Sequence, residues 1–114
     1  ENRIETLLSY ETKPSLLHGD LWSGNVMCSA INEPVIFDPA CYYGCRETDI
    51  AMTRLFGGFP RNFYEAYNYH FPLCEGWERR QPVYQLYHIM NHLNLFGSGY
   101  LHETISLLND CISD

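Results

Sequence analysis

The sequence predicts an α+β fold that is mostly helical with one short β-hairpin, and three observations support this prediction. Apolar residues recur at helical spacing through most of the second half of the 114-residue chain. Two short apolar runs nearer the start are separated by a polar turn, as in a hairpin. Just before them, residues 18–25 (HGDLWSGN) combine an imidazole, a carboxylate, an indole, a hydroxyl and a carboxamide with glycine. Such a loop is more typical of a functional site than of a surface turn.

The composition excludes several classes of protein. Apolar residues make up 46 % of the chain and aromatic residues 15 %, so the chain can build a core and is not disordered. Its formal net charge of −7 argues against nucleic acid or an anionic membrane as the main partner. No apolar run approaches the length of a transmembrane helix. A chain of this length is one domain or part of one.

The five cysteines stand at irregular spacings that match neither a disulfide framework nor a zinc pattern. Free thiols are the simplest interpretation, and we expect a cytoplasmic location. A metal pair at Cys41 and Cys45 is the alternative. Because the sequence does not begin with methionine, it makes no prediction about targeting signals.

The elements of the first half follow from apolar spacing and from helix breakers. A helical pattern at the start of the chain stops before Pro14. Residues 15–18 lead into the loop that carries the functional groups. Residues 25–29 and 34–38 predict the two strands of the hairpin, and residues 39–47 predict a further loop.

The remainder of the chain is predicted to be helical. The expected ranges are residues 47–56, 61–71, 82–96 and 100–112. Gly57 and Gly58 end the first of these helices, and Pro82 is expected to begin the third, because proline is favoured in a first helical turn. Arg79 and Arg80 are expected to be a solvated pair.

The spacing of three residues in the loop matches the catalytic loop of kinases, H-R-D-L-x-x-x-N. Asp20 and Asn25 lie five positions apart, and His18 precedes the aspartate by two. In such a loop the aspartate accepts the proton of an attacking hydroxyl, and the asparagine holds Mg²⁺ on the phosphates. Gly19 and Gly24 leave room for the chain to reverse direction.

Asp38 supplies a second candidate metal ligand, because it ends the apolar run 34–37 where a kinase places its metal-binding aspartate. Magnesium held by Asn25 and Asp38 would let an acidic protein bind a triphosphate. His18 is expected to support the loop, with proton transfer as the alternative. Ser23 could be a nucleophile, but no G-x-S-x-G motif surrounds it.

Three segments then make the resemblance specific. Residues 16–25 (LLHGDLWSGN), 37–60 (FDPACYYGCRETDIAMTRLFGGFP) and 84–100 (YQLYHIMNHLNLFGSGY) closely resemble the fructosamine kinase (ketosamine-3-kinase) family. That family belongs to the aminoglycoside-phosphotransferase-like branch of the protein-kinase-like fold. Aminoglycoside and choline kinases share the loop only in part. Trp22 and Ser23 instead point to the ketosamine branch.

The resemblance implies a role for each site residue. Asp20 is the expected catalytic base, and Asn25 and Asp38 are the expected Mg²⁺ ligands, with ATP as the phosphate donor. Asp49 is similar to a helix aspartate that hydrogen-bonds the catalytic-loop backbone, with a helix cap as the alternative. Arg46 and Glu47 could form an ion pair that fixes the loop, or reach the substrate. The residues expected to support the site are His18, Gly19, Gly24, Glu47 and Asp49.

The substrate side of the site is expected to involve Trp22, His88 and Asn91. The Trp22 indole could stack on a sugar or pack on an alkyl chain of the acceptor, with simple packing as the alternative. His88 and Asn91 lie on a predicted helix that resembles a polar wall facing a substrate cleft. His88 and His92 are four apart, but Ile89 replaces the glutamate of H-E-x-x-H, so a zinc site is a distant alternative.

A working kinase of this kind also needs a phosphate-covering strand and a lysine, and the only lysine here is Lys13, on the wrong side of the loop. Residues 1–114 are therefore expected to form a carboxy-terminal lobe that lacks its amino-terminal nucleotide-binding lobe and is inactive alone. The intact enzyme is expected to phosphorylate the third hydroxyl of ketosamines, such as glycated lysine, and so to initiate protein deglycation. The alternatives are a kinase for an aminoglycoside, choline or another amino sugar, and a non-catalytic acceptor-binding lobe.

Overall fold

The computed structural model describes residues 3–10 and 12–113, which form two compact units. The first, here called the strand unit, runs from Lys13 to Glu75. The second, here called the helical unit, combines the residues up to Thr12 with those from Gly76 onward. The secondary structure is mixed, with helices and two small two-stranded sheets, as the α+β prediction requires.

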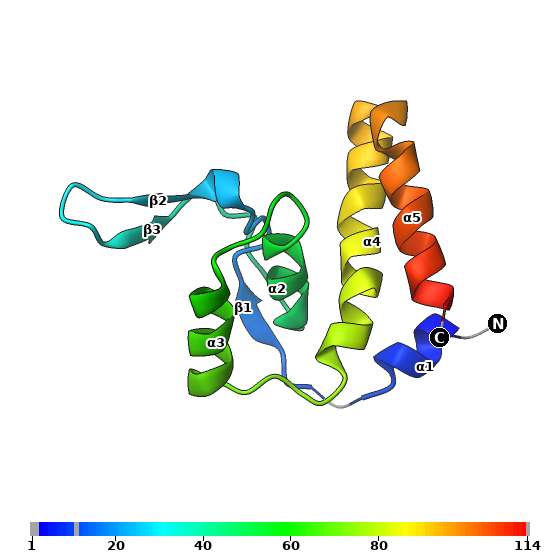
Figure 1. Ribbon diagram of the computed structural model, residues 1–114, viewed down its shortest axis with the longest axis horizontal. Coiled ribbons are helices and arrows are strands. Elements are labelled where there is room, and N and C mark those ends of the chain that lie inside the picture. The colour runs from blue at the N-terminus through cyan, green and yellow to red at the C-terminus, as the bar shows by residue number, and fades with distance from the viewer. Residues whose placement is uncertain (1–2, 11, 114) are drawn as a thin grey trace. The chain divides into compact units, whose positions relative to one another are not determined.

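The predicted hairpin is confirmed in the strand unit. Strand β2 (Val26–Cys28) pairs antiparallel with β3 (Pro34–Ile36), so that Val26 lies opposite Ile36. The hairpin projects away from the remainder of the strand unit (Figure 1). The residues from Ala30 to Tyr43, which include the turn of the hairpin, β3 and the segment after it, are exposed.

The second sheet corrects the predicted loop at 39–47 and adds a strand in the segment 15–18, to which no element had been assigned. Strand β1 (Ser15–Leu17) pairs antiparallel with β4 (Tyr42–Gly44). Each strand has only three residues, too few to show a period of two. Because the partners lie far apart in the sequence, their pairing depends on tertiary contacts that local patterns do not encode.

Two helices complete the strand unit. Helix α2 (Glu47–Thr53) ends before the predicted residue 56, and α3 (Arg61–His70) ends within one residue of the prediction. The hydroxyl of Thr53 hydrogen-bonds the Tyr64 hydroxyl at 2.9 Å and so joins the two helices. Ile50 and Met52 of α2 are almost fully buried, so this helix contributes most of the core near the loop.

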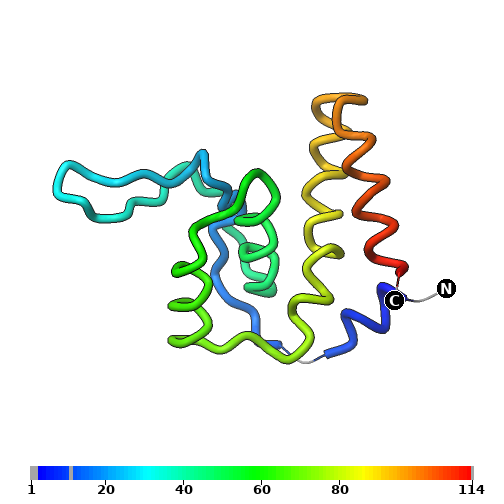
Figure 2. The backbone as a smooth tube through the Cα atoms, in the orientation of Figure 1, coloured from blue at the N-terminus to red at the C-terminus, as the bar shows by residue number. Residues whose placement is uncertain are grey.

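The helical unit contains α1 (Arg3–Leu8), α4 (Trp77–Phe96), the 3₁₀ turn η2 (Ser98–Tyr100) and α5 (Leu101–Ile112). Helices α4 and α5 run antiparallel and lie side by side, with α1 against both (Figure 2). Their buried apolar side chains are Val83, Leu86, Ile89 and Cys111.

Helix α4 corrects two predictions. It begins at Trp77, so Pro82 lies inside the helix and does not start it. The Gly76 carbonyl accepts hydrogen bonds from Arg79 and Arg80, which closes the first turn ahead of the proline. Arg80 is buried, with its guanidinium carbon 3.8 Å from the centre of the Tyr10 ring, and is not a solvated residue.

None of the five cysteines forms a disulfide, which agrees with the thiols expected from their spacing. None of the helices in the described part of the chain combines the length and the apolar character that a membrane crossing needs.

Candidate functional site

Two successive turns fold the loop after β1 back on itself. Trp22 N–H donates to the Asp20 carbonyl at 3.1 Å, and Asn25 N–H donates to the Trp22 carbonyl at 2.9 Å. Residues Ser23–Asn25 form the 3₁₀ turn η1, and β2 begins at the next residue. The reversal expected from the two glycines is therefore present.

The reversal brings the side chain of Asn25 onto Asp20. The Asn25 Nδ2 group donates to the Asp20 backbone carbonyl at 2.9 Å and to the Asp20 carboxylate at 3.1 Å. Asn25 is buried, whereas Asp20 is partly open to solvent. The amide thus fixes the direction of the carboxylate, and the carboxylate keeps access to a substrate hydroxyl.

Asp38 follows β3 at the base of the hairpin. Phe37 N–H donates to the Asn25 carbonyl at 3.0 Å, so the residue before Asp38 pairs directly with Asn25. The φ angle of Asp38 is +54°, in the left-handed region that residues other than glycine adopt uncommonly. A strained residue beside a candidate catalytic loop is typical of a functional position.

Asn25 and Asp38 offer oxygen atoms of the kind that magnesium binds in proteins. Both Asn25 side-chain hydrogen bonds use Nδ2, so Oδ1 is the atom left for a cation. Magnesium in phosphate-transfer sites takes one or two protein ligands and completes its shell with phosphate oxygens and water. Within residues 3–10 and 12–113, no group of three or more His, Cys, Asp or Glu side chains is arranged to hold a metal ion, as a closed zinc site would require.

Asp49 of α2 binds the backbone at the start of the loop. Its two carboxylate oxygens accept hydrogen bonds from His18 N–H at 2.8 Å and from Gly19 N–H at 3.0 Å. Hydrogen bonds to a charged acceptor are stronger than neutral ones, so α2 and the loop are firmly connected.

His18 is buried, and both of its ring nitrogens are engaged. Asp20 N–H donates to Nδ1 at 3.2 Å, and Nε2 lies 2.8 Å from the Phe37 carbonyl oxygen. A ring nitrogen that accepts carries no proton, so the proton is on Nε2, which donates to Phe37. The neutral imidazole therefore connects the loop of Asp20 to the segment of Asp38.

The two glycines of the loop allow close approaches. Gly19 has a φ of +88°, and a Cβ there would lie 2.0 Å from the Ala40 carbonyl oxygen. A Cβ at Gly24 would lie 2.2 Å from the ring of Trp22. The Trp22 ring also meets the edge of Phe56 at 5.8 Å between centres and stays 37 % exposed. Contacts within the protein thus cover part of the indole surface. Contact of the indole with a sugar stays a prediction.

Arg46 makes structural contacts within the strand unit. Its guanidinium donates to the carbonyls of Phe71 at 2.7 Å and Pro72 at 2.5 Å, and lies 3.6 Å from the centre of the Phe71 ring. These contacts attach the start of α2 to the end of α3. The two roles considered for Arg46, an ion pair with Glu47 that fixes the loop and a contact with the substrate, both stay predictions. Its neighbour Glu47 is buried in the first turn of α2.

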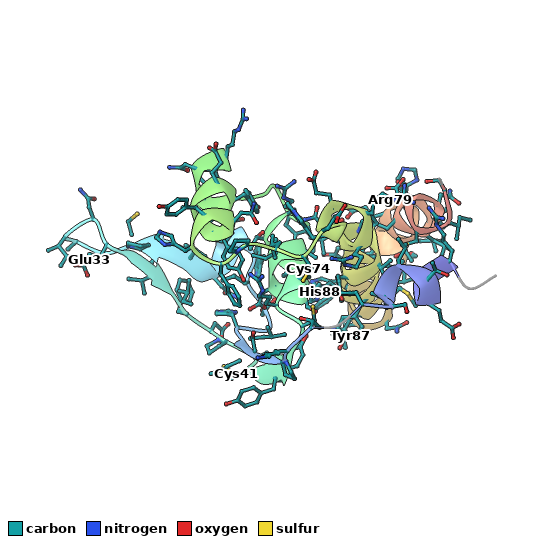
Figure 3. All side chains as sticks on the ribbon, turned by 90° about the horizontal axis from the view of Figure 1, so that it is seen from below. Glu33, Cys41, Cys74, Arg79, Tyr87 and His88 are labelled. Carbon is teal, nitrogen blue, oxygen red and sulfur yellow. The ribbon has the colours of Figure 1, made fainter. Side chains whose placement is uncertain are left out.

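His88 and Asn91 lie on α4 in the helical unit. His88 is buried and Asn91 is exposed, and Figure 3 shows His88 beside Tyr87 on that helix. His92 uses Nδ1 in a 2.9 Å hydrogen bond to the His88 carbonyl, which is a contact within the helix. The role of His88 and Asn91 in substrate binding stays a prediction.

Sequence reasoning missed three contributors to the site. Phe37 and Ala40 take part through backbone atoms, which carry no signal in the side-chain pattern. Phe56 contacts Trp22 from the turn after α2. A signal for that turn was present in Gly57 and Gly58, both of which adopt positive φ.

The whole sequence, residues 1–114, matches the sequence model of the family described as fructosamine kinase. A probable ketoamine kinase of Vibrio parahaemolyticus is 52 % identical over 109 residues, which cover 96 % of this chain and 38 % of that protein. The protein-ribulosamine 3-kinase, chloroplastic, of Arabidopsis thaliana is 52 % identical over 98 residues, which cover 86 % of this chain and 30 % of that protein.

Two solved structures with similar folds are also described as candidate fructosamine-3-kinases. A candidate fructosamine-3-kinase of Thermobifida fusca matches with a TM-score of 0.89 at 36 % identity, over 97 % of this chain and 38 % of that one. A second candidate, from Haemophilus somnus, matches with a TM-score of 0.83 at 41 % identity, over 96 % of this chain and 38 % of that one. The chain spans less than half the length of each of these relatives.

Proposed function

Since the chain belongs to the fructosamine kinase family, we propose that it is the carboxy-terminal lobe of a longer ketosamine 3-kinase. In the full-length protein, ATP donates a phosphoryl group to the third hydroxyl of a ketosamine, such as the sugar of a glycated lysine. The phosphorylated adduct then decomposes and releases the amine, which amounts to deglycation. The names of the relatives, ketoamine kinase and protein-ribulosamine 3-kinase, support this substrate class.

The observation that carries the proposal is the hydrogen bond of 3.1 Å between the Asn25 amide and the Asp20 carboxylate. One side chain thereby connects a candidate base to a candidate metal ligand. Asp20 takes the proton of the acceptor hydroxyl while the hydroxyl oxygen attacks the γ-phosphorus of ATP. The bond from that phosphorus to the bridging oxygen breaks, and ADP leaves.

Magnesium, when bound, neutralises charge on the phosphates and orients them. Asn25 Oδ1 and the Asp38 carboxylate are the atoms that would hold it. Asp49, through the backbone of His18 and Gly19, keeps the loop in place. Trp22, which is 37 % exposed and two residues from the base, is our candidate for contact with the sugar.

Phosphate transfer by the full-length protein tests the proposal. The acceptors are fructosyl-lysine, ribulosyl-lysine, an aminoglycoside and choline, each with ATP and Mg²⁺. We expect transfer to the ketosamines alone, and a loss of kcat on the order of 10²-fold or more in D20N, because a general base is removed. The matched control is D110N, an exposed aspartate on α5, which should keep full activity.

Two outcomes would contradict the proposal. Transfer only to the aminoglycoside or choline would keep the chemistry and change the substrate class. Ketosamine binding without transfer to any acceptor would instead identify an acceptor-binding lobe without catalysis. For Trp22, an unchanged KM and kcat for ketosamine in W22A would reduce its role to packing.

A further inference from the structure

His18 holds both ends of the segment that contains Asp38. Its ring Nε2 lies 2.8 Å from the Phe37 carbonyl, and its own backbone carbonyl accepts from Ala40 N–H at 2.8 Å. The residues between these two contacts are Asp38 and Pro39. Asp38 has an exposed side chain and a positive φ, a conformation that residues other than glycine adopt uncommonly, so contacts on both sides of it help to hold it there.

The same imidazole also reaches the other loop. Its Nδ1 accepts the Asp20 N–H at 3.2 Å, two residues along the chain. One buried ring therefore contacts the backbone of the candidate base on one side and the segment of the candidate metal ligand on the other. The backbone N–H of His18 donates a hydrogen bond of 2.8 Å to the Asp49 carboxylate, so the backbone that carries the ring is itself held in place.

We propose that His18 is a positioning residue that sets the alignment of Asp20 relative to Asp38, with its two ring nitrogens doing separate tasks. This inference rests on the proposed function. The Nδ1 acceptor orients the base, and the Nε2–H donor holds Asp38 in its left-handed conformation. A singly protonated ring with hydrogen on Nε2 is the one form that makes both contacts.

Two substitutions separate the two tasks. In H18N, the side-chain oxygen replaces Nδ1 as acceptor for Asp20, and no group reaches Phe37. In H18Q, the side-chain amide extends to the Nε2 position and donates to Phe37, and the acceptor for Asp20 is lost. Measured in the full-length protein, H18N should raise the Mg²⁺ concentration for half-maximal rate by about 10-fold, as losses around metal ligands do. H18Q should keep that concentration and lower kcat by a similar factor.

The matched controls are H102N and H102Q, at an exposed histidine of α5, which should change neither parameter. Equal effects of H18N and H18Q on both parameters, or no effect of either, would overturn the separation of tasks. D20N, assayed in parallel, reports on the proposed function itself. If the parent protein transfers no phosphate, the proposed function is wrong, and the inference about His18 is then tested by the NMR measurement described next.

Nitrogen NMR of the histidine rings tests His18 without any assay of activity. In the parent protein without metal, at neutral pH, we expect the His18 signals to show a proton on Nε2 and none on Nδ1. A proton on Nδ1, or on both nitrogens, would overturn the inference even if every variant of His18 failed to fold.

Discussion

The Trp22 indole lies so close to Gly24 that no side chain fits between them. Replacing Gly24 by alanine would place a Cβ 2.2 Å from the ring, so the indole or the turn must shift. We expect G24A to lower the free energy of unfolding by about 1–3 kcal/mol, as overpacking does, and to alter tryptophan fluorescence. Urea denaturation monitored by circular dichroism measures the first effect.

A matched glycine serves as the control for this prediction. Gly99 has open space around the position of its Cβ, so G99A should change stability by about 0.5 kcal/mol or less. Equal stability of G24A and G99A would contradict the packing described for Trp22. In the double variant W22A/G24A, the clash disappears, so the two substitutions should not be additive.

Cys111 differs from the other thiols in its environment. It is 1 % exposed, and burial, with Asp110 as a second cause, raises the pKa of its thiol above the ordinary value. A raised pKa means that the folded chain keeps this proton where the unfolded chain has lost it. The resulting contribution to stability is complete below the ordinary thiol pKa of about 8.5 and is lost as the pH rises above it.

Two measurements check this prediction for Cys111. Iodoacetamide should modify the exposed Cys28, Cys41 and Cys74 in the folded protein and spare Cys111. Between pH 7 and pH 10, the parent should lose more stability than C111A, because the variant has no thiol to titrate. Rapid alkylation of Cys111 under native conditions would show that its thiol is accessible.

At the scale of elements, α4 contains an unusual feature in Pro82. A proline at this position has no N–H to donate to the Glu78 carbonyl four residues earlier, and its ring crowds that carbonyl. We expect P82A to stabilise the protein by on the order of 1–2 kcal/mol, since the helical gain exceeds the lost stiffness of the unfolded chain. Urea denaturation of the two proteins measures the difference.

Pro60 is the matched control for this substitution. It directly precedes α3 and has a φ of −59°, where a missing N–H breaks no helical hydrogen bond. P60A should therefore bring no gain. If P82A, like P60A, brings no gain in stability, the prediction is wrong and the packing of Pro82 in α4 offsets its cost to the helix.

At the scale of the whole molecule, the strand unit exposes several large apolar side chains to solvent. Leu16, Ile31, Ile36 and Tyr43 are each more than half exposed. Two of them, Leu16 and Ile36, also line a cavity of about 300 Å³, together with Leu17, His18, Pro39 and Cys41. Apolar surface of this extent is typical of a face that another part of the protein covers.

We therefore expect the 114-residue chain, produced alone, to bind the dye ANS and to transfer no phosphate to fructosyl-lysine. The full-length protein should bind less dye and be active. Fluorescence titration and a transfer assay on both proteins measure this. A transfer rate from the isolated chain close to that of the full-length protein would contradict the expected need for a nucleotide-binding lobe.

The amino-acid sequence was enough to predict α3, the hairpin and the chemical character of the loop, but not the start of α4 or the end of α2. Periodic apolar spacing predicted α3 and the hairpin β2–β3 closely, because both depend on contacts between residues near in sequence. The spacing of Asp20, Asn25 and Asp38 singled out the candidate site in the same way.

The links between these parts depend on tertiary contacts. The pairing of β1 with β4, the bond of the Asp49 carboxylate to the loop backbone and the contact of the His18 ring with the Phe37 carbonyl all join residues distant in sequence. Several of these links involve backbone N–H and carbonyl groups, which nearly all residues have, so the identity of the residues does not predict them. The burial of Arg80 likewise depends on Tyr10, a residue about seventy positions away.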